Sequence, residues 1–125
     1  MDIWYHGSPL ELSMLLPGST ITRERHVAEV FSHKPEIVSV EDDGSMYHNG
    51  RLAGFLYAVD EAVSQDDIEP HPRTTMPAGW EWLTRRPLRL KMLGPVDFVS
   101  AELLDDAAVA LLREKAGRGR AGERE

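Results

Sequence analysis

The chain has 125 residues, 42% of them hydrophobic, and a formal net charge of −7, which fits a single compact domain with a packed core. It has no cysteine, so we expect no disulfide and no metal site. No apolar run reaches the roughly 20 residues that cross a bilayer, and nothing in the sequence signals secretion. We therefore expect no membrane segment and a cytoplasmic monomer. The acidic balance also argues against general nucleic-acid binding, because phosphate recognition depends on Lys and Arg.

The beginning of the chain predicts a strand followed by a helix. Residues 2–6 are rich in aromatic and β-branched types, which favours a short strand. Thr22 is of a residue type that caps helices, and it precedes a predicted helix over about 23–33. Val27 and Val30 lie three residues apart on the apolar face of this helix, and charged residues fill the opposite face.

The middle of the chain contains two turn signals. Asn49-Gly50 is typical of a type I′ turn, which needs positive φ at both central positions. It predicts a hairpin that joins residues 45–48 to a largely apolar, central strand within 51–60. The Asp-Asp-Gly sequence at 42–44 predicts only a simple turn.

Strands continue through the second half of the chain, and a helix closes it. Residues 61–79 hold three prolines and a glycine and predict a long ordered loop, a type that often carries function. Ser100 is expected to cap a final helix, the domain is expected to span 1–115, and a disordered tail is expected over 116–125. Further strands are predicted at 36–40, 80–84, 88–92 and 96–99. Because strands dominate and do not alternate regularly with helices, we expect an α+β fold.

The residues that end the first predicted strand carry the first functional signal. Tyr5-His6-Gly7-Ser8 places an imidazole beside a glycine, where a ligand can approach the backbone closely. This stretch resembles the first core strand of ADP-ribosyltransferases, which ends in His-Gly-Ser or His-Gly-Thr, and the short bacterial rifampin-modifying enzymes are the most similar in size and order of features. The resemblance implies that His6 hydrogen-bonds a ribose hydroxyl of NAD, that Gly7 holds the nicotinamide carboxamide through its backbone, and that Ser8 supports the turn.

Three later stretches follow the order of features in that family, although none of them is specific alone. They are Thr20-Ile21-Thr22 before an Ala28-x-x-Phe31 pattern, the central strand from Gly54 to Asp60 that contains Tyr57, and Asp66-Asp67 with a proline-rich loop before Arg86-Pro87-Leu88-Arg89-Leu90. The likeness covers about residues 3–92. It implies an ADP-ribosyltransferase-like split β-sheet core with a helix after the first strand and a C-terminal helix.

One position departs from the family's pattern. The second motif of the family usually supplies a tyrosine, and Thr20 stands at that position here. A threonine cannot stack on nicotinamide, so ring packing would have to come from Tyr5, Tyr57 or a tryptophan.

The identity of the catalytic acid is open. An acid is needed because breaking the nicotinamide–ribose bond builds positive charge on the ribose. The rifampin-modifying relatives point to Asp67, or less well to Asp66, whereas the wider superfamily points to Glu81. The plainer interpretations are a solvated turn for the aspartate pair and an outward-facing position for Glu81, between two tryptophans on the other face of a strand.

The implied activity is mono-ADP-ribosyl transfer from NAD to an unknown acceptor, which is a small molecule, a protein or a nucleic-acid end. One alternative is a non-catalytic nucleotide- or protein-binding module of the same fold, which Thr20 favours; another is an NAD-hydrolysing toxin. His6 taken alone is also explained as a strand-end histidine bonded to backbone. His26 and His33 share a helix face, but without a third ligand they predict no zinc site.

Overall fold

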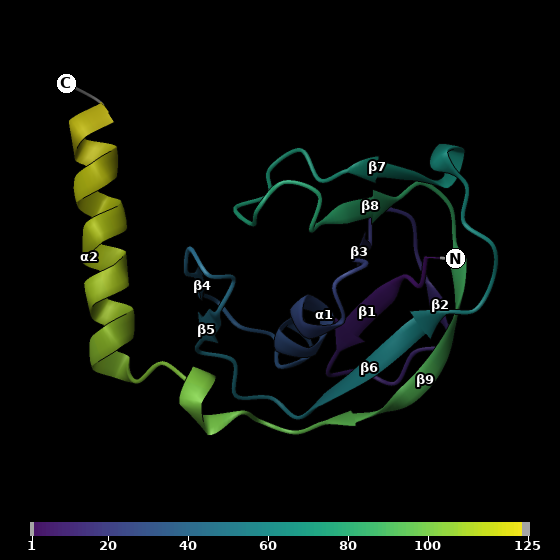
Figure 1. Cartoon of the computed structure of the whole chain (residues 1–125), viewed down its shortest axis with the longest axis horizontal. Coiled ribbons are helices and arrows are strands. Elements are labelled where there is room, and N and C mark those ends of the chain that lie inside the picture. The colour runs from purple at the N-terminus through teal and green to yellow at the C-terminus, as the bar shows by residue number, and fades with distance from the viewer. Residues whose placement is uncertain (1, 124–125) are drawn as a thin grey trace.

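The computed structural model of the chain describes residues 2–123, and the side chains of residues 2–115 (Figure 1). It confirms a mixed α+β fold. The strands are β1 (Tyr5–Ser8), β2 (Met14–Leu15), β3 (Thr20–Ile21), β4 (Val38–Val40), β5 (Met46–His48), β6 (Gly54–Val59), β7 (Ile68–Pro70), β8 (Trp82–Thr84) and β9 (Leu88–Val96). The helices are α1 (Arg25–Ser32) and α2 (Asp106–Glu123), with short 3₁₀ turns η1 (Gln65–Asp67) and η2 (Ser100–Glu102).

The strands form three antiparallel sheets. One sheet has the order β1-β6-β9-β2, a second has the order β3-β8-β7, and β4 and β5 form a hairpin of their own. The first sheet curls along the long strand β9 into a half-barrel, and β7 and β8 lie across its opening (Figure 1). The two larger sheets meet at one bridge, where Tyr5 and Thr22 exchange two backbone hydrogen bonds of 2.7 and 3.0 Å.

Strand β6 is the central strand that the sequence predicts. It pairs with β1 on one side and with β9 on the other. Leu56 and Tyr57, in the middle of β6, have exposed fractions of 3% and 0%. The apolar run in the sequence therefore reflects burial on both faces of this strand.

Helix α1 packs closely on β1 because Gly7 has no side chain. A Cβ atom at Gly7 would lie 1.8 Å from the carbonyl oxygen of Ala28 in α1. The helix begins and ends within the predicted range, with Val27 and Val30 buried on its inner face. Thr22 is not the N-cap, which is Glu24, but its hydroxyl accepts the backbone N–H of Glu24 at 3.0 Å.

The prediction of a hairpin at Asn49-Gly50 is wrong. Strand β5 pairs with β4, and the Asp-Asp-Gly sequence at 42–44 makes the connecting turn, with Gly44 at a φ of +89°. The side chain of Asn49 instead accepts the backbone N–H groups of Glu36 and Ile37 at 2.9 and 3.0 Å. Asn-Gly favours a tight turn locally, but here β6 pairs with β1 and β9 rather than with β5, so the chain leaves β5 without reversing onto it.

The C-terminal part differs from the prediction in where its elements begin. The predicted loop over 61–79 contains η1 and the short strand β7. The final helix begins at Asp106 rather than after Ser100, and the Asp105 carboxylate accepts the N–H of Ala108 at 2.8 Å, which caps it. The helix stands at one side of the molecule (Figure 1). The prediction of a disordered tail over 116–125 falls where side chains are not described, and it stays a prediction.

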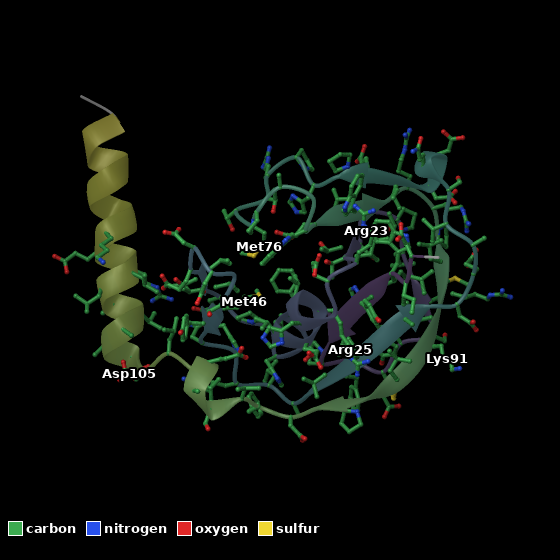
Figure 2. All side chains as sticks on the ribbon, in the orientation of Figure 1. Arg23, Arg25, Met46, Met76, Lys91 and Asp105 are labelled. Atoms are coloured by element: carbon green, nitrogen blue, oxygen red, sulfur yellow. The ribbon has the colours of Figure 1, made fainter. Side chains whose placement is uncertain are left out.

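The core has two clusters of buried side chains. One contains Trp4, Leu15, Ile21 and Leu88, and the other contains Val27, Val30, Met46 and Met76. Figure 2 shows Met46 and Met76 in the region between the β4–β5 hairpin and the segment that precedes β8. Among residues 2–123, neither helix combines the length and the apolar character needed to cross a membrane.

Candidate functional site

The candidate site lies where β1 and β3 separate. Tyr5 directs its backbone N–H and C=O toward β3, where both bond to Thr22. Backbone groups alternate in direction along a strand, so those of His6 face β6 and those of Gly7 face the β3 side again. Beyond the bridge β3 pairs with β8 and not with β1. The N–H and C=O of Gly7 therefore point into an opening, which we call the strand split.

The ring of His6 spans the strand split. Its Nδ1 lies 2.7 Å from the carbonyl oxygen of Thr20, and because a carbonyl only accepts, Nδ1 carries the proton. Burial lowers the pKa of His6, with a partial opposing effect from the bond to Thr20. The imidazole is therefore neutral at pH 7, and its Nε2 is a hydrogen-bond acceptor.

A pocket of about 230 Å³ opens at the strand split. Four residues that the sequence singles out line it, namely Tyr5, His6, Gly7 and Thr20, and Thr22, Ala28 and Phe31 complete the wall. The aromatic ring of Phe31 was not among the predicted ligand contacts. The Ala-x-x-Phe spacing was its signal, because it places both residues on one face of α1.

Ser8 and Tyr57 lie behind the pocket rather than in its wall. Both are buried, with exposed fractions of 7% and 0%. The Ser8 hydroxyl accepts the N–H of Leu10 at 3.1 Å, and the Tyr57 hydroxyl donates to the carbonyl of Leu10 at 2.7 Å and accepts the N–H of Leu12 at 2.9 Å. These bonds hold the segment that follows β1, and because Tyr57 is completely buried, its ring is closed to a ligand.

Glu81 lies immediately before β8. Strand β8 pairs with β3 through Leu83 opposite Thr20 and Trp82 opposite Ile21, and Thr20 and Thr22 at this end of β3 line the pocket. The backbone carbonyl of Glu81 accepts the N–H of His71 at 3.1 Å. One carboxylate oxygen of Glu81 accepts the hydroxyl of Thr74 at 2.6 Å. Its other oxygen makes no hydrogen bond within the described part of the chain.

The two tryptophans beside Glu81 do not share a face as predicted. Trp82 lies in β8 and packs edge-to-face on Trp4, with ring centroids 5.9 Å apart. Trp80 precedes the strand and packs against the cluster that contains Met76. The alternation assumed for a strand over 80–84 begins only at Trp82.

Asp67 belongs to a different set of contacts, which we call the arginine clamp and which consists of Asp67, Glu61 and Arg86. The five N–H groups of the Arg86 guanidinium donate to the two Asp67 oxygens at 2.8 and 3.2 Å, to Glu61 at 2.7 Å and to two backbone carbonyls. Arg86, followed by the N–H of Ser64, lowers the pKa of Asp67 to about 2. Asp66 beside it is exposed.

Neither Asp67 nor Glu81 lines the pocket that contains His6. Among the described residues, no group of three or more His, Asp or Glu side chains is placed to hold a metal ion. Comparison with protein-family models, with curated protein sequences and with solved structures gives no match to this chain. The roles of these residues therefore stay predictions.

Proposed function

We propose that the chain is an ADP-ribosyltransferase-like enzyme that breaks the nicotinamide–ribose bond of NAD and transfers ADP-ribose to an acceptor. The observation that supports this most is the strand split, which directs the amide and carbonyl of Gly7 into a pocket beside a neutral His6. A primary carboxamide has one acceptor oxygen and one donor NH₂ group. A backbone N–H and C=O side by side are the complementary pair, which favours nicotinamide as the occupant.

The size of the pocket fits one ring rather than a whole dinucleotide. Its volume of about 230 Å³ lies below the range of about 300–1,000 Å³ that encloses drug-sized ligands. Nicotinamide would lie inside, between the rings of Tyr5 and Phe31, which take the place of the tyrosine missing at Thr20. The ribose would then lie at the mouth, where the Nε2 acceptor of His6 is free for a hydroxyl.

Glu81 is the acid that this geometry favours. Cleavage transfers the bonding electron pair to nicotinamide and leaves an oxocarbenium-like ribose, which the acceptor attacks. A carboxylate that holds the 2′-hydroxyl stabilises that charge by about 3 kcal/mol, or about two orders of magnitude in rate. Glu81 has one oxygen without a partner among the described residues, and it directly precedes β8, which pairs with the pocket strand β3. Both oxygens of Asp67 are already bonded within the chain.

A second candidate function is a non-catalytic nucleotide-binding module, and Thr20 is the residue that favours it. Without an aromatic side chain at that position, the pocket can hold a ligand yet orient it poorly for reaction. Transfer to water, as in an NAD-hydrolysing toxin, uses the same residues and differs only in the acceptor.

The test is a nicotinamide-release assay, combined with the change in melting temperature (Tm) that NAD causes. We expect release by the wild type, and about 100-fold less with Glu81→Gln while NAD still raises Tm. Glu69→Gln is the matched control, because Glu69 is an exposed carboxylate opposite Leu83 of β8. Release in buffer alone would identify a hydrolase. Stabilisation by NAD without release would support the binding module, and the absence of both would refute NAD as the ligand.

A further inference from the structure

A second, larger cavity lies away from the His6 pocket. It has a volume of about 880 Å³, which is within the range for small-molecule sites. We call it the tryptophan groove. Its floor is apolar and includes Trp4, Val63, Ile68 and Trp82, and its rim carries Asp2, Arg23, Asp60 and Glu61. Trp82 pairs with Ile21, and side chains alternate between faces, so the groove and the His6 pocket lie on opposite faces of β3 and β8.

The two indole rings of the groove already hold a flat cation from the chain itself. The guanidinium carbon of Arg23 lies 5.2 Å from the ring centre of Trp4 and 5.6 Å from that of Trp82. Figure 2 shows Arg23 between β1 and the β7–β8 strands. Its ion pair with Asp2 is 3.5 Å long, and the two side chains are 43% and 67% exposed. Such an exposed pair holds Arg23 weakly, so the rings are accessible to a competing cation.

The rim of the groove is predominantly acidic. Glu61 is held in the arginine clamp, while the Asp60 carboxylate is exposed and makes no contact within the described part of the chain. The backbone of Asp60 is fixed, because its N–H donates to the carbonyl of Arg89 at 2.8 Å. The Arg89 guanidinium donates to the backbone carbonyl of Asp60 at 3.3 Å, but the Asp60 carboxylate itself makes no hydrogen bond or ion pair in the described part of the chain. Asp60 therefore presents an unpaired carboxylate at the edge of an apolar cavity.

We propose that the tryptophan groove binds a small organic cation with a flat apolar body, such as an amidine, a guanidine or an aromatic amine. The flat body contacts the Trp82 and Ile68 surface, and the cationic group lies at Asp60 and the indole faces. An anionic ligand would face the unpaired Asp60 carboxylate, because Asp2 is paired with Arg23 and Glu61 with Arg86. The inference does not depend on NAD chemistry, because no residue of the groove lines the His6 pocket.

Three probes of nearly the same shape test the charge preference: benzamidine as the cation, benzamide as the neutral analogue and benzoate as the anion. The chain has three tryptophans, and each gives one indole N–H signal in a ¹H–¹⁵N spectrum. Benzamidine should shift the signals of Trp4 and Trp82 in a saturable way and leave Trp80, which is outside the groove, unchanged. Benzamide should bind more weakly and benzoate weakest.

Two exposed substitutions should change benzamidine affinity in opposite directions. Asp60→Asn removes the unpaired carboxylate and should weaken binding about five-fold. Arg23→Gln removes the competing cation from both rings and should strengthen it about three-fold. Asp66→Asn is the matched control, because Asp66 is an exposed neighbour outside the groove.

The proposal has clear contrary results. It is overturned if benzamidine causes no saturable shift up to its solubility limit, or if Trp80 shifts as much as Trp4 and Trp82. It is also overturned if benzoate binds as tightly as benzamidine, or if Asp60→Asn retains the full preference for the cation. None of these results bears on nicotinamide release.

Discussion

The arginine clamp and the strand split both contain polar residues that the sequence singles out. They differ in how completely these residues are hydrogen-bonded within the chain. In the clamp, all five Arg86 donors and both Asp67 oxygens bond within the chain. In the split, the Gly7 backbone and the His6 Nε2 have no partner among the described residues, and one oxygen of Glu81, just before β8, likewise makes no hydrogen bond there. Polar groups with complete sets of partners stabilise a fold, whereas groups left open near a cavity are available to a ligand. This contrast distinguishes Asp67, which is fully hydrogen-bonded, from Glu81, although the sequence offers both as candidate acids.

Gly7→Ala should have the largest effect, because it tests the packing that creates the split. The added Cβ would lie 1.8 Å from the Ala28 carbonyl oxygen, which is backbone and cannot rotate away. We expect α1 to be displaced, with a loss of about 3 kcal/mol in the free energy of unfolding. Denaturant titration measures this loss. A variant as stable as the wild type would mean that α1 does not rest on β1 as described.

Arg86→Met should have the next largest effect, because it removes the centre of the clamp. Asp67 and Glu61 would then face each other without a counter-charge, and two backbone carbonyls would lose their donor. We expect a clear fall in Tm, while Glu81→Gln leaves Tm nearly unchanged. Arg85→Met is the control, because Arg85 is exposed and its side chain makes no hydrogen bond in the described part of the chain. Equal Tm values for Arg85→Met and Arg86→Met would remove the distinction between the two regions.

The two regions should also lose stability at different pH values. Burial lowers the pKa of His6 below its usual 6.5, so its contribution is present above pH 6.5 and is lost as the pH falls through the folded-state pKa. The pKa of Asp67 falls from its usual 3.8 to about 2, so its contribution is present above about pH 4 and is lost between there and pH 2. For His6→Asn we expect the free energy of unfolding to fall less steeply below pH 6.5 than it does in the wild type. For Asp67→Asn we expect it to fall less steeply only between about pH 4 and pH 2. If both variants changed the same pH interval, the two groups would not be responsible for separate parts of the pH dependence.

The sequence predicts the elements whose signals are local. The α1 residues and the buried run of β6 follow from periodicity and residue type, and Tyr5, His6, Gly7 and Thr20 line one pocket. The strand predicted over 2–6 is found at Tyr5–Ser8, and the two strands predicted over 88–92 and 96–99 are replaced by the single strand β9. The hairpin fails because the Asn49-Gly50 signal says nothing about which strands pair at long range.

The clamp was not predictable for a related reason. Asp67 and Arg86 lie 19 residues apart, and they meet only because β7 pairs with β8. The sequence indicates two acidic candidates, but which of them has a partner depends on that pairing. The tryptophan groove is equally non-local, since its two indoles come from Trp4 and Trp82, which lie far apart in the sequence.

Thr74→Val should have the smallest effect. It tests whether the hydroxyl of Thr74 positions the carboxylate of Glu81. The substitution keeps the shape of the side chain and removes the hydroxyl that donates to Glu81 at 2.6 Å and accepts the N–H of Met76 at 3.0 Å. We expect a loss of about 1 kcal/mol in stability and, if Glu81 is the catalytic acid, a several-fold change in nicotinamide release. Thr75→Val is the control, because Thr75 is exposed and makes no hydrogen bond in the described region. A change in stability alone would leave Thr74 as a structural support, whereas a change in release with NAD affinity unaltered would show that it orients the carboxylate for the reaction.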